Sequence, residues 1–178
     1  MYNNDILALS VFPNMNTSIQ CLNHKRSDSN KTLARRLSRL AATQALYEIE
    51  ISQASPHEVV QAFFSFDFSS ISDYATSSQV DALFFKNLVI NTVHDTPNLD
   101  SMLIAALEPD FTLHRLEVLL RSILRLGSCE LLSFSEVPAK VIITEYVEIS
   151  RDFFLAREPA LVNAVLDQIA RLLRKSEI

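Results

Sequence analysis

The chain of 178 residues contains a single glycine, Gly127, where average usage of about 7% gives roughly 12. Phosphate-binding loops, dinucleotide fingerprints and tight β-hairpins need several glycines, because only glycine adopts positive φ at little cost. The glycine count therefore argues against a nucleotide-binding α/β enzyme and against a hairpin-rich β domain. Twenty-one acidic residues, six prolines and many Leu and Ala residues indicate helices joined by short, proline-marked turns.

Helix start signals predict seven helices and hence an all-α bundle. Each predicted helix begins at a capping residue or a proline, and apolar residues then recur at helical spacing. The predicted starts and approximate ends are Ser29–Thr32 to Ile51, Ser55-Pro56 to Phe64, Ser78-Asp81 onward, Thr96-Pro97 to before Pro109, Thr112 to Leu132, Val137-Pro138 to Phe154, and Pro159 to Arg174.

The first 30 residues differ from the remainder in composition and charge. They are rich in Asn and Ser and show no sustained period, which predicts a disordered basic tail (1–30) before a helical domain (31–178). Residues 1–40 carry a net charge of +4, whereas residues 41–178 carry −9. A basic arm on an acidic body is typical of a protein with a polyanionic partner, although a solubilising helix surface would give the same pattern.

The first predicted helix combines an apolar stripe with basic residues. The stripe recurs at spacings of three and four and comprises Leu33, Leu37, Leu40, Gln44, Tyr47 and Ile51. Lys31, Arg35 and Arg39 follow one another at i, i+4 on another face, with Arg36 alongside. This pattern predicts that the arginines lie outside the core as a basic strip.

The sequence predicts no catalytic site, metal or cofactor. His57 and Glu58 are followed by Gln61 where a metalloprotease motif has its second histidine, and glutamine is a poor zinc ligand. Glu145 and Glu148 lack the histidine of a di-iron helix motif, which favours a solvated face. The chain has no GxSxG motif and no paired cysteines.

The sequence also predicts a cytoplasmic protein that does not enter a membrane. Its first residues lack the basic region of a secretory signal, and no apolar run approaches 18 residues.

Four segments in order resemble the bacterial transcription antitermination protein NusB family. Residues 35–39 (RRLSR) with 44–47 (QALY) resemble that family's arginine-rich first helix. Residues 115–132 resemble its R-L-D…R-A-I-L-R…Y-E-L helix, residues 136–145 (EVPAKVIITE) resemble D-V-P-Y-K-V-x-I-N-E, and residues 162–167 (VNAVLD) resemble V-N-G-V-L-D. The resemblance extends over residues 31–174.

The resemblance implies a fold of two packed antiparallel helical sub-bundles and an activity of binding. NusB-like proteins pair with the small ribosomal protein NusE, and the pair delivers single-stranded boxA RNA of ribosomal transcripts to elongating RNA polymerase. Arginine suits this role because its planar fork pairs bidentately with phosphate and stays charged. The residues predicted to bind RNA are Lys31, Arg35, Arg36, Arg39 and Arg157.

The sequence departs from the family pattern at three places. The family's D-S-H-K-F segment, which borders the RNA, is replaced by residues 157–161 (REPAL), where Arg157 adds a charge. Leu120 replaces a glutamate thought to face NusE, so it either contacts the partner or lies in the core. Leu40 replaces another glutamate, and its place on the apolar stripe predicts packing. Tyr47 has the same two alternatives as Leu120.

Two alternative functions follow from the same residues. One is a NusB-like ribosomal-RNA-binding module such as the N-terminal domain of RNA cytosine methyltransferases. That alternative predicts a downstream catalytic domain, which is not found before Ile178. The other is a protein-interaction bundle with weak RNA binding, in which a homodimer buries the arginines.

Overall fold

The computed structural model describes residues 29–65, 80–108, 111–155 and 157–177. Within these ranges the chain forms seven α-helices, one short 3₁₀ turn and no strand, which confirms the predicted all-α class. The elements are α3 (Ser29–Ser52), α4 (Pro56–Ser65), α5 (Ala82–His94), α6 (Thr96–Ala106), η4 (Leu113–Arg115), α7 (Val118–Ser133), α8 (Ala139–Phe153) and α9 (Glu158–Leu173). The predicted tail, apart from residues 29 and 30, lies outside the described residues.

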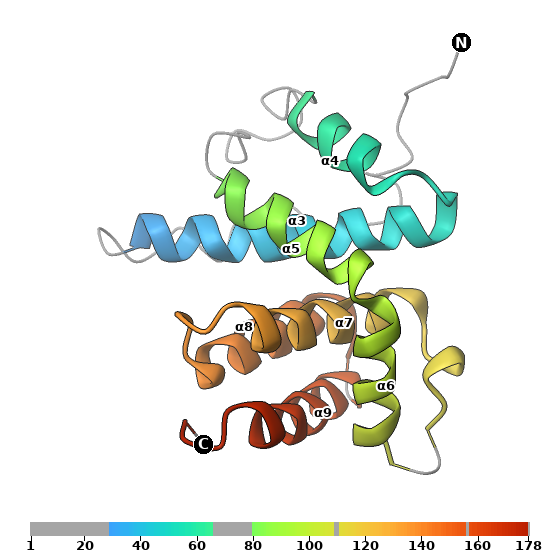
Figure 1. Cartoon of the computed structure of the whole chain (residues 1–178), viewed down its shortest axis with the longest axis vertical. Helices are drawn as coiled ribbons and strands as arrows, with labels where there is room; N and C mark the ends of the chain where they lie inside the picture. Colours follow the sequence, from blue (N-terminus) through green and yellow to red (C-terminus); the bar gives the residue numbers. More distant parts are fainter. Residues whose placement is uncertain (1–28, 66–79, 109–110, 156, 178) are drawn as a thin grey trace.

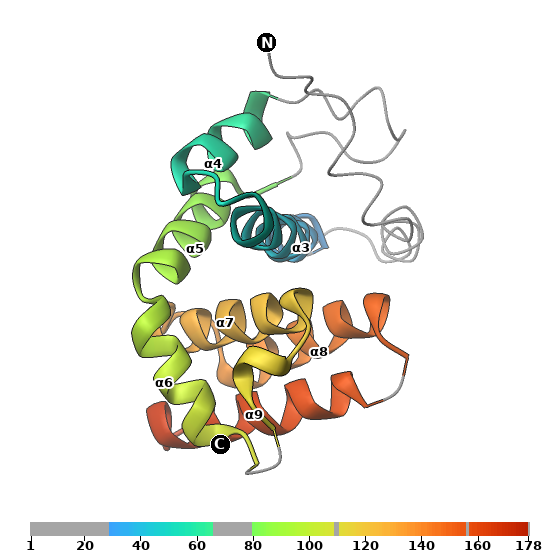
Figure 2. The same ribbon diagram turned by 90° about the vertical axis from the view of Figure 1, so that its right-hand side faces the viewer.

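The helices form two packed groups (Figure 1). Helices α3, α4 and α5 pack on one another, and α7, α8 and α9 form a second group with α6 along its side. Figure 2 shows α3 lying directly above α7 and α8, so that α3 joins the two groups. This arrangement confirms the two sub-bundles that the family resemblance implies.

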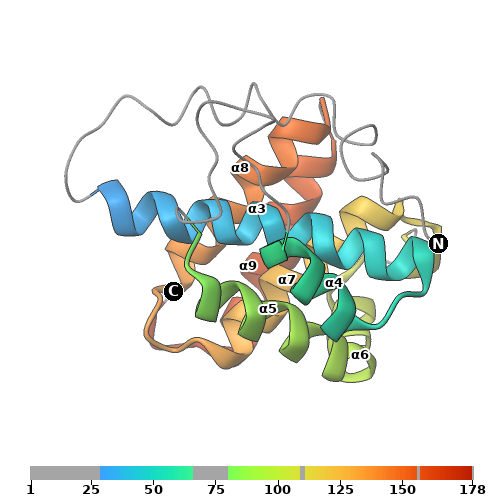
Figure 3. The ribbon, with the colours of Figure 1, turned by 90° about the horizontal axis from the view of Figure 1, so that it is seen from above.

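The middle of α3 is buried on all sides, because α4 and α5 pack against it within its own group and α7 and α8 pack against it from the other group. Residues 37–46 are all buried, a run of ten. Half of this run is small, with Ser38, Ala41, Ala42, Thr43 and Ala45, so neighbouring helices can approach closely. Seen from above in Figure 3, α3 crosses over α7, α8 and α9. The predicted apolar stripe is therefore only part of the buried surface, and Ile51 at its end is 59% exposed.

The helix boundaries follow the predicted capping residues with one exception. Asp81 caps α5, its Oδ1 accepting a hydrogen bond from the Phe84 amide at 3.0 Å. Pro97 lies in the first turn of α6 and Pro159 in that of α9, as predicted. Thr112, however, precedes the short turn η4 and makes no capping hydrogen bond, so the predicted fifth helix is wrong at its start: α7 begins later, after Glu117.

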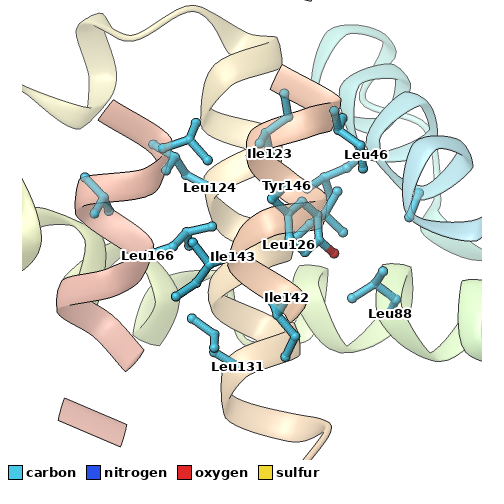
Figure 4. Packing of buried hydrophobic residues seen from close by; sticks show 14 of the residues in the cluster. Leu46, Leu88, Ile123, Leu124, Leu126, Leu131, Ile142, Ile143, Tyr146 and Leu166 are labelled. Carbon is cyan, nitrogen blue, oxygen red and sulfur yellow. The ribbon is translucent and has the colours of Figure 1, made fainter. Parts of the chain in front are cut away.

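Gly127 permits the close approach of α7, α8 and α9. A Cβ atom at this position would lie 2.7 Å from Leu166 Cδ1 and 3.2 Å from Tyr146 Cδ2. Figure 4 shows how tightly Leu126, Tyr146, Leu166 and their neighbours pack in this region. The single glycine is therefore needed for helix packing, and not for a turn.

Leu120 lies in the core. Only 4% of the residue is exposed, and it belongs to the same apolar cluster as Ile123 and Leu124. Of the two alternatives for this position, the burial of Leu120 favours core packing. Leu83 on α5, by contrast, is 69% exposed.

No helix within the described ranges is both long enough and apolar enough to cross a bilayer.

We expect Leu120→Glu to lower the free energy of unfolding by about 3 kcal/mol or more, because it removes core packing and buries a carboxyl group. Leu83→Glu is the matched control, and it should change stability by less than about 0.5 kcal/mol, as exposed substitutions usually do. Urea unfolding of both variants measures the difference. Equal stability of the two variants would contradict the core position of Leu120.

Candidate nucleic-acid interface

The five residues predicted to bind RNA occupy different environments. Lys31 and Arg157 are exposed, and Arg36 is half-buried. The side chain of Arg35 retains 23% exposure and that of Arg39 only 4%. The basic residues at the start of α3 therefore do not form one exposed strip, since their exposure to solvent falls from Lys31 to Arg39.

Arg35 links the start of α3 to the start of α5. Its Nε donates a hydrogen bond to Asp81 Oδ2 at 3.0 Å, so Asp81 both caps α5 and pairs with α3. The guanidinium lies 4.3 Å from the ring centroid of Phe84, within cation–π range. Arg35 also lies 3.8 Å from Glu136, in the connection between α7 and α8.

Arg39 is a core residue, and the prediction that it faces away from the core is wrong. Its fork holds the carboxylate of Glu130 on α7, with Nε to Oε2 at 2.9 Å and Nη2 to Oε1 at 2.6 Å. Glu130 is fully buried. A buried carboxylate requires such a partner, because removing it from water costs several kcal/mol.

Tyr146 on α8 completes the environment of Glu130. Its hydroxyl donates a hydrogen bond to Glu130 Oε2 at 2.9 Å. Burial, and after it the charge of Glu130, hold the pKa of Tyr146 well above its ordinary value, so this hydroxyl remains a donor. Arg39, Glu130 and Tyr146 thus join α3, α7 and α8 at one point.

Arg36 is the α3 arginine with no internal carboxylate partner at ion-pair distance among the described residues. Burial raises the pKa of the Glu145 carboxyl on α8, and the charges of Arg39 and then Arg36 oppose this rise. Lys31 is exposed, and Arg36 is half-buried like Arg35 but has no ion pair with a described carboxylate. These two residues therefore carry the positive charge of α3 that no described carboxylate neutralises directly.

Arg157 lies at the cap position of α9, directly after the connection from α8. Its carbonyl oxygen accepts a hydrogen bond from the Leu161 amide at 3.0 Å, whereas its side chain makes no hydrogen bond or ion pair with any described residue. Leu155 in the same connection is fully exposed.

A second, partly buried ion-pair network was not predicted from the sequence. Arg121 and Arg125 on α7 both bind Glu50 near the end of α3, and Arg125 also binds Asp100 on α6 with a bidentate fork at 2.7 and 2.8 Å. Arg121 further donates to the carbonyl oxygen of Leu116 at 3.1 Å. The i, i+4 spacing of the two arginines was the available signal, since it places both on one face of α7.

The role of Arg174 in holding the end of α7 was not predicted from the sequence either. Its guanidinium donates hydrogen bonds to four carbonyl oxygens at and beyond the end of α7, those of Glu130, Leu131, Phe134 and Val137. It therefore adds a donor at the end of a helix, where the helix's own amides no longer reach every carbonyl group.

The two predicted partner-binding residues differ in exposure. Tyr47 is half-buried on α3, so its side chain reaches both the core and the surface, whereas Leu120 is buried. Among the helices and loops that the structure describes, no three His, Cys, Asp or Glu residues gather as metal ligands would.

The described part of the chain is an all-helical bundle with basic residues in the first turns of α3. The model of the NusB family matches residues 36–171. The "Transcription antitermination protein NusB" of Sinorhizobium fredii is 45% identical over 136 residues, which are 76% of this chain and 85% of the relative. The protein of the same name from Rhizobium etli is 44% identical over the same shares. The chain belongs to the NusB family.

Solved structures agree in fold. NusB of T. maritima superposes with a TM-score of 0.66 at 24% identity and covers 80% of this chain and 95% of its own. A structure titled "Crystal Structure of Antitermination Factors NusB and NusE in complex with dsRNA" superposes with a TM-score of 0.63 at 20% identity, covering 77% and 96%.

We expect Arg39→Met to destabilise the protein by about 3–5 kcal/mol, because it leaves the buried Glu130 carboxylate without its cation. Arg36→Met, three residues away, should change stability by less than about 0.5 kcal/mol. Chemical unfolding of the two variants measures both values.

Combining Arg39→Met with Glu130→Gln should recover part of the loss, since the neutral amide needs no cation. If Arg39→Met and Arg36→Met were equally stable, the structural role of Arg39 would be wrong.

Proposed function

We propose that this chain is a transcription antitermination factor. With the ribosomal protein NusE it binds boxA-type single-stranded RNA of ribosomal transcripts and delivers that RNA to the elongating RNA polymerase complex in the cytoplasm. The observation that carries the proposal is membership of the NusB family over 76% of the chain. It acts by binding and not by catalysis.

Two exposed basic residues and one half-buried arginine support the binding of a polyanion. Lys31 and Arg36 lie in the first turns of α3, and Arg157 lies at the start of α9. Helix N-termini add unpaired amide groups and the positive end of a helix dipole, both of which favour phosphate. We assign RNA contact to these three residues. Arg35 contributes its charge from beside Asp81, and Arg39 holds α3 in position.

NusE is the proposed protein partner. Tyr47 is half-buried and aromatic, which suits a contact residue at a protein interface. The burial of Leu120 supports core packing for that residue, so we do not assign it to this interface. A chain that instead formed a homodimer over the start of α3 would bury the same cations.

We expect RNA binding to weaken with salt, because each phosphate contact releases counterions. Three contacts give a slope of log K against log salt of about −2, from roughly −0.7 per contact on single strands. Fluorescence anisotropy of labelled single-stranded boxA-type RNA, with NusE present, measures the slope. Double-stranded RNA of the same sequence tests strand preference.

Lys31→Ala with Arg36→Ala should reduce the RNA affinity and the magnitude of the slope. Lys86→Ala with Arg171→Ala is the matched control, since it removes the same charge from exposed positions on α5 and α9. A slope near zero for the unmodified chain, or equal losses in the two double variants, would overturn the proposed function or its assignment to α3.

A further inference from the structure

Arg35 on α3 combines the position of an RNA-binding residue with an internal acidic partner. It lies one helical turn after Lys31 on the same face, and its side chain retains 23% exposure. Its Nε donates a hydrogen bond to Asp81 Oδ2 at 3.0 Å, and its Nη1 lies 3.8 Å from Glu136 Oε1. Neither Nη atom donates a hydrogen bond to a described residue. The guanidinium therefore keeps unused donors, although Asp81 compensates its charge.

A buried aromatic ring supports the Arg35 side chain from another direction. The guanidinium carbon lies 4.3 Å from the ring centroid of Phe84, which is 3% exposed. The negative face of the ring attracts the cation, and this contact uses none of its N–H donors. We therefore expect the guanidinium to stay over Phe84 when Asp81 is not paired with it, already ordered for an incoming phosphate.

Asp81 can lose its pairing with Arg35 and still hold the start of α5. Its Oδ1 caps the helix through the Phe84 amide, whereas Oδ2 is the atom that pairs with Arg35. The backbone carbonyl of Asp81 also accepts a hydrogen bond from Ser38 Oγ on α3 at 3.2 Å. The contact between α3 and α5 thus has a support that does not involve the carboxylate.

The pair of Arg35 and Asp81 is open to solvent in a way that the pair of Arg39 and Glu130 is not. The side chains of the first pair are 23% and 30% exposed, and those of the second are 4% and 0% exposed. An ion pair that water still reaches stabilises a protein only slightly, so another anion can compete for its cation. The buried pair cannot be opened, because an uncompensated charge would remain in the core.

We propose that Asp81 withholds Arg35 from RNA, so that the first turns of α3 contain a further phosphate site that this carboxylate keeps closed. A phosphate that binds Arg35 must displace the Asp81 carboxylate or share the guanidinium with it, and two anions on one cation repel each other. Asp81 therefore lowers RNA affinity, and neutralising it opens the site. The inference rests on the proposed function and adds a residue that limits it.

The test measures the affinity of the full chain, with NusE, for labelled single-stranded boxA-type RNA by fluorescence anisotropy. Asp81→Asn removes the charge and keeps a side-chain oxygen that can cap α5. At about 0.1 M salt it should bind about three- to tenfold more tightly than the unmodified chain, and the slope of log K against log salt should steepen by about 0.7, the value for one more phosphate contact.

The matched control is Asp167→Asn, which frees a different arginine from a carboxylate. Asp167 pairs with Arg171 at 2.7 Å on the exposed side of α9, and α7 and α8 lie between this helix and α3 (Figure 1). The net charge changes equally in the two variants. Asp167→Asn should change RNA affinity by less than about twofold, because its charge is far from the start of α3 and is screened by salt.

Two double variants identify Arg35 as the cation that binds the phosphate. Asp81→Asn with Arg35→Ala should lose the gain in affinity and the steeper slope. Asp81→Asn with Arg35→Lys keeps every charge but lacks the planar fork that stacks on Phe84 and pairs with phosphate, so it should lose most of the gain. A gain that is fully retained with lysine would overturn the inference, because a general effect of charge would then explain it.

The remaining outcomes separate the inference from the function on which it rests. Salt-dependent binding by the unmodified chain with equal affinities for Asp81→Asn and Asp167→Asn would overturn the inference alone. Asp81→Ser, which also caps a helix without a charge, repeats the measurement if Asp81→Asn does not fold. Failure of both variants to fold would overturn the inference, because Asp81 would then be needed for the fold. Absence of salt-dependent binding by the unmodified chain would overturn the proposed function as well.

Discussion

The ion pair between Arg39 and Glu130 is the interaction on which the arrangement of the helices depends. It joins residues 91 positions apart, and both side chains are almost completely removed from water. A charge buried in this way is stable only when its partner is fixed, so α3 has one position and one rotation relative to α7. The Tyr146 hydroxyl adds α8 to the same constraint. Glu130 cannot change partners without leaving an unpaired charge in the core.

Ion pairs connect α3 to neighbouring helices near both of its ends as well as in its middle. Arg35 binds Asp81 near its start, and Glu50 binds Arg121 and Arg125 near its end. Between them, small residues allow the two groups of helices to approach α3 from opposite sides. The surface formed by the first turns of α3 is consequently held rigidly, and a binding surface that is already ordered loses little conformational entropy when it binds a ligand.

The class of fold and most helix starts could be predicted from the sequence because they depend on local features, such as the single glycine, the capping residues and the prolines. The environment of each arginine could not. Spacing of i, i+4 places Lys31, Arg35 and Arg39 on one face, and an amphipathic helix with one buried face would expose that face. Helix α3 is buried on both sides, so one face runs from exposed Lys31 to buried Arg39. The partners Asp81, Glu130 and Glu50 come together only when the chain has folded.

A count of arginines in the sequence therefore overstates the charge that is available to RNA. Two of the three arginines at the start of α3 already neutralise carboxylates of the protein, and a cation paired in this way gains little from a phosphate, which would first have to displace its partner. Lys31 and Arg36 remain on α3 without an ion pair to a described carboxylate. Because the electrostatic part of single-strand binding grows with the number of phosphates contacted, so few cations give a weak interaction on their own. A partner that contributes further contacts to the same RNA would raise the affinity without any change in this surface, and the affinity would then report on whether the partner is present.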